Sequence, residues 1–144
     1  MEFSYLVVAA VLLSAALSVL AYMLRCLTKG GAVASFLVGA IVGVFSSINA
    51  FFLLTVFTIA GFIATIKDFD KKEAEGLQEG KKGERTWKNV LGVGLPPCLV
   101  VALDCLNLID QTAFAVMFVS TITVAGADTI ASEIGVRDKN VYMI

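Results

Sequence analysis

The sequence of 144 residues contains no histidine, and only 16% of its residues are charged. The chain therefore has no histidine for general acid–base catalysis, for a Ser-His-Asp or Cys-His triad, or for a metal site. The three cysteines, Cys26, Cys98 and Cys105, form no C-x-x-C pair, which argues against a zinc site and a disulfide framework. The net charge of −1 gives no indication of nucleic-acid binding.

Hydrophobic residues, in contrast, make up 58% of the chain, and the mean hydropathy is +0.89. A soluble domain of this length could not bury so much apolar surface, so the composition predicts an integral membrane protein. Residues 3–24 and 30–66 carry no charge. The second run would form a helix of roughly 55 Å, against a hydrocarbon core of about 30 Å. It therefore predicts two helices, separated near Ser46–Asn49.

The sequence thus predicts an all-α fold, a polytopic transmembrane helix bundle that forms a single domain over 1–144. The first apolar run follows no basic residue and is longer than the apolar part of a signal peptide, so it is interpreted as a true span. Five membrane helices are expected, at about 3–25, 31–46, 48–66, 92–109 and 112–134.

The positions of lysine and arginine predict the orientation of these helices. Seven of the eleven basic residues lie in the charged loop 67–89, and the others lie at 25–29 and 137–139. With the N-terminus outside, all eleven are cytoplasmic, as the positive-inside rule requires. The middle of the loop, 70–83, is interpreted as a solvated linker.

Glycine and proline mark two further features. Gly31, Ser35, Gly39 and Gly43 recur every fourth residue. For Ser35, Gly39 and Gly43 this spacing predicts close helix packing without chemistry. The stretch Gly92–Pro97 contains two glycines and two adjacent prolines, and a residue before proline avoids the α conformation. We therefore expect the fourth helix to begin with a bent or re-entrant segment.

Three polar stretches are expected at the cytoplasmic boundary of the membrane. In the first, Lys29, Gly30 and Gly31 could offer a cation and backbone N–H groups to a phosphate at a helix N-terminus. The alternative is a lysine that only extends to the membrane edge. In the second, Arg85 and Lys88 could bind phosphate and Asn89 could orient it, although a positive-inside flank would look the same.

The third stretch, 128–135, places two carboxylates, Asp128 and Glu133, on an otherwise apolar helix together with Thr129 and Ser132. Carboxylates near a membrane are costly and usually functional, and Mg²⁺ prefers carboxylate and phosphate oxygens. The two acids are about 140° apart around a regular helix, so they share one metal only if the helix is distorted or their roles differ. Asp104, within the fourth helix, is open to a functional or a hydrogen-bonding role.

These motifs resemble a known family. The stretch 128–135 reads D-x-x-A-x-x-x-G, which is similar to the CTP-binding signature of dolichol kinase and CDP-diacylglycerol synthase. Together with Leu27–Ala32 and Arg85–Gly94, it more closely resembles the integral membrane phytyl-phosphate kinase family, long described as a domain of unknown function. That family continues beyond this point, so the chain is expected to be the N-terminal part of a larger enzyme, completed by a C-terminal half or by a homo-oligomer.

The resemblance implies a CTP-dependent kinase that phosphorylates an isoprenyl monophosphate, such as phytyl phosphate, at the cytoplasmic membrane face. It implies that Asp128 and Glu133 hold Mg²⁺ and the CTP phosphates. Neutralisation of phosphates would fall to Lys29, Arg85 and Lys88, and hydrogen bonding to Asn89, Thr129 and Ser132. The alternatives are a CTP-dependent cytidylyltransferase acting on a lipid phosphate, and a non-enzymatic carrier or assembly subunit for phosphorylated lipids.

Overall fold

The computed structural model describes the backbone of residues 2–66 and 84–135 and the side chains of residues 4–63 and 84–131. The described chain forms five α-helices, which confirms the predicted all-α membrane bundle. The loop interpreted as a solvated linker lies outside the described residues. The helices are α1 (Glu2–Met23), α2 (Lys29–Phe45), α3 (Ile48–Ile66), α5 (Trp87–Cys105) and α6 (Gln111–Gly135).

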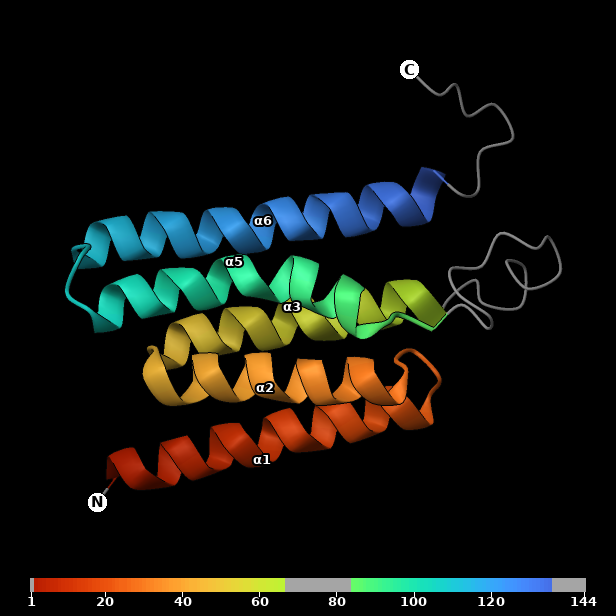
Figure 1. The fold of residues 1–144 in the computed structure, drawn as a ribbon, viewed down its shortest axis with the longest axis horizontal. Coiled ribbons are helices and arrows are strands. Elements are labelled where there is room, and N and C mark those ends of the chain that lie inside the picture. Colours follow the sequence, from red (N-terminus) through yellow and green to blue (C-terminus); the bar gives the residue numbers. More distant parts are fainter. Residues whose placement is uncertain (1, 67–83, 136–144) are drawn as a thin grey trace, which may run out of the picture.

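The helices run up and down, so that the three predicted polar stretches from distant parts of the chain reach one end of the bundle (Figure 1). The start of α2, the start of α5 and the last turns of α6 lie at this end, and the α2–α3 and α5–α6 turns lie at the other. Within the described residues, the basic side chains are Arg25, Lys29, Arg85 and Lys88. All four belong to segments at the end where α2 and α5 start. We call it the basic end.

Three of the helices are long and apolar enough to cross a membrane, judged by length and composition: Ser4–Met23 in α1, α5, and Gln111–Ala131 in α6. The described apolar parts of α2 and α3, Lys29–Phe45 and Ile48–Ile63, are shorter. With 17 residues, α2 is about 26 Å long, slightly less than the hydrocarbon core. That all five helices span the membrane, and with which orientation, stays a prediction.

The expected start of the fourth helix is wrong. Instead of a re-entrant segment, α5 begins at Trp87 and continues through Pro96 and Pro97 without interruption. Pro97 and Gly94 are buried on this helix, and an ideal Cβ on Gly94 would lie 2.7 Å from Cγ2 of Val38 on α2. Each proline removes one helical N–H, and its ring crowds the carbonyl group four residues earlier. Close packing on α2 therefore outweighs the local preference against helix before proline.

The predicted small-residue stripe does mediate close packing, with α2 at the centre of the bundle between α1 and α5. An ideal Cβ on Gly39 would lie 2.6 Å from Oγ of Ser14, and one on Gly43 would lie 2.8 Å from Cβ of Ala10. Both partners are small, buried residues of α1. Small residues on both helices thus allow the two backbones to approach, as is typical of membrane bundles.

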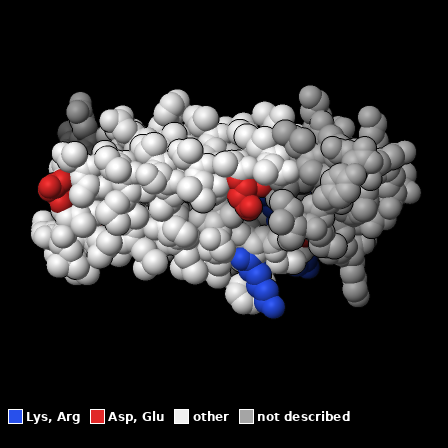
Figure 2. Space-filling view, turned by 90° about the horizontal axis from the view of Figure 1, so that it is seen from above, with Lys and Arg blue, Asp and Glu red and all other residues white. Residues whose placement is uncertain are grey.

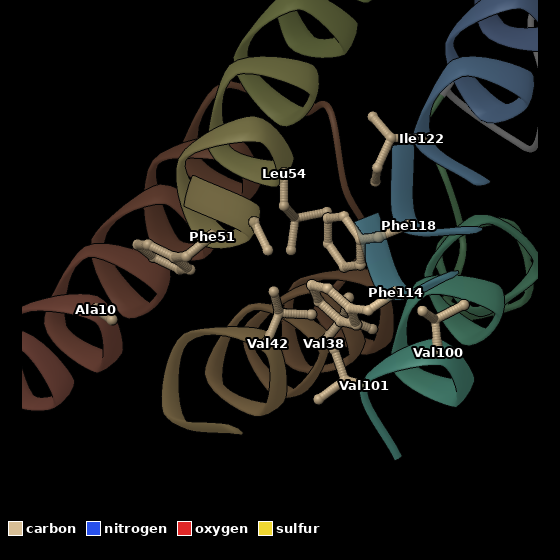
Figure 3. Close-up of a cluster of buried hydrophobic side chains, with 11 residues drawn as sticks. Ala10, Val38, Val42, Phe51, Leu54, Val100, Val101, Phe114, Phe118 and Ile122 are labelled. Carbon is tan, nitrogen blue, oxygen red and sulfur yellow. The ribbon is translucent and has the colours of Figure 1, made fainter. Parts of the chain in front are cut away.

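All five helices contribute to the hydrophobic core (Figure 3). The rings of Phe114 and Phe118 stack with centroids 5.6 Å apart and face core residues of α2 and α3 such as Val42 and Leu54. On the outside, large apolar side chains such as Phe52 and Val124 are about two-thirds exposed. The face of the bundle seen in Figure 2 is mostly uncharged. Acidic side chains lie at one end of this face, and acidic and basic side chains lie near its middle. Such an apolar exterior suits contact with lipid.

Two helices end in the same hydrogen-bonded turn. At the end of α1, Cys26 N donates to Ala21 O at 2.9 Å, and Arg25, with φ of 58°, donates to Tyr22 O. At the end of α5, Asn107, with φ of 54°, takes the corresponding place. This is the Schellman motif, in which the left-handed residue is usually glycine or asparagine.

Asp104 lies in the last turn of α5, where it contacts the start of α6. Its Oδ1 accepts a hydrogen bond from Nε2 of Gln111 at 3.1 Å. Asp110 caps α6, since its Oδ1 accepts from Ala113 N at 2.8 Å. The partner of Asp104 is thus a residue that the sequence did not single out, and the contact ties the two helix ends together.

The position of Cys105 allows a test of the predicted orientation. Cys105 is exposed at the end opposite to the basic end, whereas Cys26 is buried. In a variant carrying Cys26→Ala and Cys98→Ala, a membrane-impermeant maleimide should label Cys105 in right-side-out vesicles. A Met23→Cys control with Cys105→Ala, at the exposed end of α1, should be labelled only after permeabilisation. The reverse pattern would place the N-terminus inside.

Candidate functional site

A short backbone pairing joins the first two predicted motifs. Arg85 N donates to Cys26 O at 2.9 Å, and Thr28 N donates to Arg85 O at 3.1 Å, so that Leu27 and Arg85 form a parallel β-bridge. The turn before α2 and the segment before α5 are thereby held side by side at the basic end. Periodicity and charge placed both motifs at one membrane face, but they gave no indication of this pairing.

Gly31 makes the pairing possible. It is buried, and an ideal Cβ on it would lie 2.6 Å from the carbonyl oxygen of Arg85. Any side chain at this position would have to push the Arg85 backbone away. The N–H of Gly31 donates to Oγ1 of Thr28 at 3.1 Å, which caps α2. The structure therefore gives Gly31 a packing and capping role, and phosphate binding by this motif stays a prediction.

Trp87 brings the two motifs into side-chain contact. An ideal Cβ on Gly30 would lie 3.4 Å from Cδ1 of Trp87, so the indole lies over the first turn of α2. Nζ of Lys88 lies 5.8 Å from the centroid of the indole, within the range of a cation–π interaction. Lys29 and Lys88 are both exposed. Together with Arg85, they give the basic end three cations on two joined segments.

A pocket extends from this end into the bundle, between α3 and α5 and over α2. Its cavity volume is about 100 Å³, and the pocket is partly open to the outside. Arg85 and Asn89 lie in its wall near the basic end, whereas Val38 and Leu54 belong to the hydrophobic core. We call it the α2–α3–α5 pocket. Lys29 does not line it and instead borders a second, apolar groove between α1 and α2.

The third motif lies at the same end, on the last turns of α6 (Figure 1). Asp128 is exposed and Thr129 is buried. An ideal Cβ on Gly126 would lie 3.8 Å from the ring of Phe57, which lines the α2–α3–α5 pocket. The side chains of Ser132 and Glu133 lie outside the described residues. Asp128 lies two residues beyond Gly126, about 200° further around the helix, and does not line the pocket.

The described side chains include no group of three or more His, Cys, Asp or Glu residues that could hold a metal ion. This does not conflict with the predicted magnesium ion, because Mg²⁺ is usually held by one or two carboxylates together with substrate phosphates and water. An exposed carboxylate at Asp128 fits that mode of binding.

Comparison with known protein families shows to which family the chain belongs. The model of the integral membrane protein DUF92 family matches residues 12–144. The chain belongs to this family. The resemblance drawn from the three motifs is therefore confirmed at the level of the family, and the DUF92 chain is an integral membrane protein.

Two relatives show the same relationship. The DUF92 chain is 30% identical over 113 residues to Protein VTE6, chloroplastic, of Arabidopsis thaliana, covering 76% of this chain and 34% of that protein. It is 31% identical over 112 residues to the uncharacterized membrane protein MJ0933 of Methanocaldococcus jannaschii, covering 78% of this chain and 44% of that protein. The chain thus spans less than half the length of these relatives. No solved structure matches it.

Cys26, for which the sequence predicted no site role, contributes its carbonyl group to the bridge. The carbonyl of Cys26 accepts from Arg85, and its side chain is 2% exposed. Burial raises the pKa of the Cys26 thiol, and the positive charge of Arg85 opposes this by favouring the thiolate. Burial dominates, so this cysteine is a structural residue of the turn rather than a nucleophile.

Proposed function

We propose that the chain forms part of a CTP-dependent kinase that converts an isoprenyl monophosphate of the phytyl type into the diphosphate. The observation that carries the proposal is the α2–α3–α5 pocket, which is apolar inside and has Arg85 and Asn89 near the basic end. A phosphorylated isoprenoid has the same division, with an anionic head and a hydrocarbon tail. The cations Lys29 and Lys88 and the carboxylate Asp128 lie on the elements around that end.

The reaction needs mainly charge neutralisation and positioning. The bond between the β–γ bridging oxygen and the γ-phosphorus of CTP breaks, and a phosphate oxygen of the isoprenyl monophosphate forms the new bond, leaving CDP. The acceptor is already largely ionised at neutral pH, since the second pKa of such a phosphate is about 6. No general base is required to deprotonate it, which fits a chain without histidine.

Within this proposal the chain's own residues divide into three groups. The side chains of Lys29, Arg85 and Lys88, with the backbone at Gly30, bind the phosphates, and Gly31 positions the Arg85 segment. Asn89, Thr129 and Ser132 hydrogen-bond the nucleotide or the water around the metal. Asp128 and Glu133 would hold Mg²⁺, which supplies neutralisation of the charge on the transferred phosphoryl group.

The partners follow from the same reading. They are CTP, the isoprenyl monophosphate and the surrounding membrane lipid, without nucleic acid, and the active site faces the cytoplasm. Because the relatives are more than twice as long as the matched region, we propose that a C-terminal half or a second copy completes the site.

A product assay tests the function. The chain is purified in detergent, with and without a C-terminal portion taken from a full-length relative, and supplied with Mg²⁺, CTP and geranylgeranyl or phytyl monophosphate. Transfer of label from the γ-phosphate of CTP to the lipid, with CDP as co-product, is expected. Transfer of label from the α-phosphate with release of pyrophosphate would show a cytidylyltransferase. Intact CTP under both conditions would contradict both enzymes and favour a carrier or assembly subunit.

A further inference from the structure

The wall of the α2–α3–α5 pocket is hydrocarbon over most of its depth. The hydroxyl of Thr58 donates to the Leu54 carbonyl at 2.8 Å within α3, so this polar atom is already satisfied by its own helix. Along α3 the pocket extends from Leu54 to Phe62, which is about 12 Å. The charged residue in its wall is Arg85, which the β-bridge holds at the basic end.

Gly61 differs from the other glycines that line this pocket. An ideal Cβ on Gly39 or Gly94 would clash with a neighbouring helix, so these two glycines serve close helix packing. An ideal Cβ on Gly61 would meet no heavy atom within 4 Å. The missing side chain at Gly61 therefore leaves space in the pocket instead of permitting a helix contact.

We propose that the α2–α3–α5 pocket binds the isoprene units next to the phosphate of the substrate, and that Gly61 is a specificity-determining residue that keeps room for them. The inference rests on the proposed function for the identity of the ligand. The anionic head lies at Arg85 and the tail passes Gly61 and Phe57 toward the core. A prenyl chain has methyl branches along its length, and a wall position without a side chain accommodates such branches where a Cβ-bearing residue narrows the passage.

The test measures binding rather than turnover. Radiolabelled geranylgeranyl monophosphate is titrated against the purified full chain in lipid nanodiscs without CTP. Gly61→Phe is expected to weaken its binding at least tenfold, and Gly61→Leu is the second variant in case the phenylalanine prevents folding. The binding of inorganic phosphate, which carries no isoprene unit, is expected to change less than threefold.

Gly92→Phe is the matched control. Gly92 also has nothing within 4 Å of an ideal Cβ, but it is exposed on α5 and does not line the pocket. The Gly92→Phe variant should bind geranylgeranyl monophosphate as the wild type does. Equal binding of geranylgeranyl monophosphate by the wild type and a folded Gly61 variant would overturn the pocket assignment. The assignment would also be overturned if dioleoyl phosphatidic acid competed with geranylgeranyl monophosphate equally strongly and in a Gly61-dependent way.

The outcomes separate this inference from the proposed function. Binding that depends on Gly61, combined with no phosphoryl transfer in the product assay, would retain the pocket and reject the kinase. Transfer that is insensitive to the substitutions at Gly61 would retain the kinase and reject the pocket. No binding of geranylgeranyl monophosphate by the wild type would overturn the inference outright.

Discussion

Asp128→Asn is expected to lower the rate of phosphoryl transfer about 100-fold or more while the protein still inserts and folds. The substitution keeps the shape of the side chain and removes its negative charge. Loss of a group that stabilises charge in the transition state typically costs about 100- to 1000-fold in kcat. Because Asp128 is exposed on α6, we expect its effect on stability to stay within about 0.5 kcal/mol. Turnover by the active assembly and thermal unfolding in detergent measure the two effects.

Asp110→Asn is the matched control for this prediction. It makes the same chemical change at the residue that precedes the same helix, at the opposite end of the bundle. Asp110 caps α6 through Oδ1, and asparagine is an equally good N-cap. Its activity should equal that of the wild type. Retained activity in Asp128→Asn would count against the kinase, and unchanged lipid binding by Asp128→Asn combined with Glu133→Gln would favour a carrier.

Gly31→Ala is expected to separate the start of α2 from the Arg85 segment at the basic end. The added Cβ would lie 2.6 Å from the carbonyl oxygen of Arg85, and the obstacle is backbone that cannot rotate away. Overpacking of this kind typically costs about 1–3 kcal/mol in the free energy of unfolding. The β-bridge at Leu27 and Arg85 must open or shift, which moves the Arg85 guanidinium away from the pocket. We therefore expect KM for the isoprenyl monophosphate to rise at least tenfold.

Thermal unfolding and substrate saturation curves check this expectation together. The control is Gly92→Ala, a helical glycine whose added Cβ meets nothing within 4 Å. It should be neutral or stabilising by up to about 1 kcal/mol, because alanine favours helix over glycine. If Gly31→Ala has the same unfolding temperature and the same KM as this control, the close approach between α2 and the Arg85 segment is not important for the site.

The sequence predicted what depends on local composition. Long uncharged runs separated by charged or polar turns give the five helices, and their ends lie within a few residues of the expected ones in α1, α2, α3 and α6. The stripe containing Gly39 and Gly43 gave the packing of α2 because small residues at spacing four have one main use in membrane helices. The same charge pattern placed Lys29, Arg85 and Asp128 at one end.

What the sequence missed depends on contacts between distant segments. The β-bridge at Leu27 and Arg85 is a single pair of residues, too short to produce an alternating pattern. The predicted start of α5 was wrong because the local conformational preference at Pro96 and Pro97 was given more weight than the packing of Gly94 on Val38. The α2–α3–α5 pocket arises from three helices at once, so no single stretch contains its signature. The relation of Glu133 to Asp128 stays a prediction.

The bridge between the turn before α2 and the segment before α5 has a consequence for biogenesis. Its two hydrogen bonds join residues on either side of α2, α3 and the long charged stretch that follows them. A nascent chain that has released only the first three helices from the ribosome carries Lys29 and Gly31 but not Arg85. The basic end therefore cannot assemble during early insertion, and under the proposed function substrate recognition arises only after α5 has docked on α2.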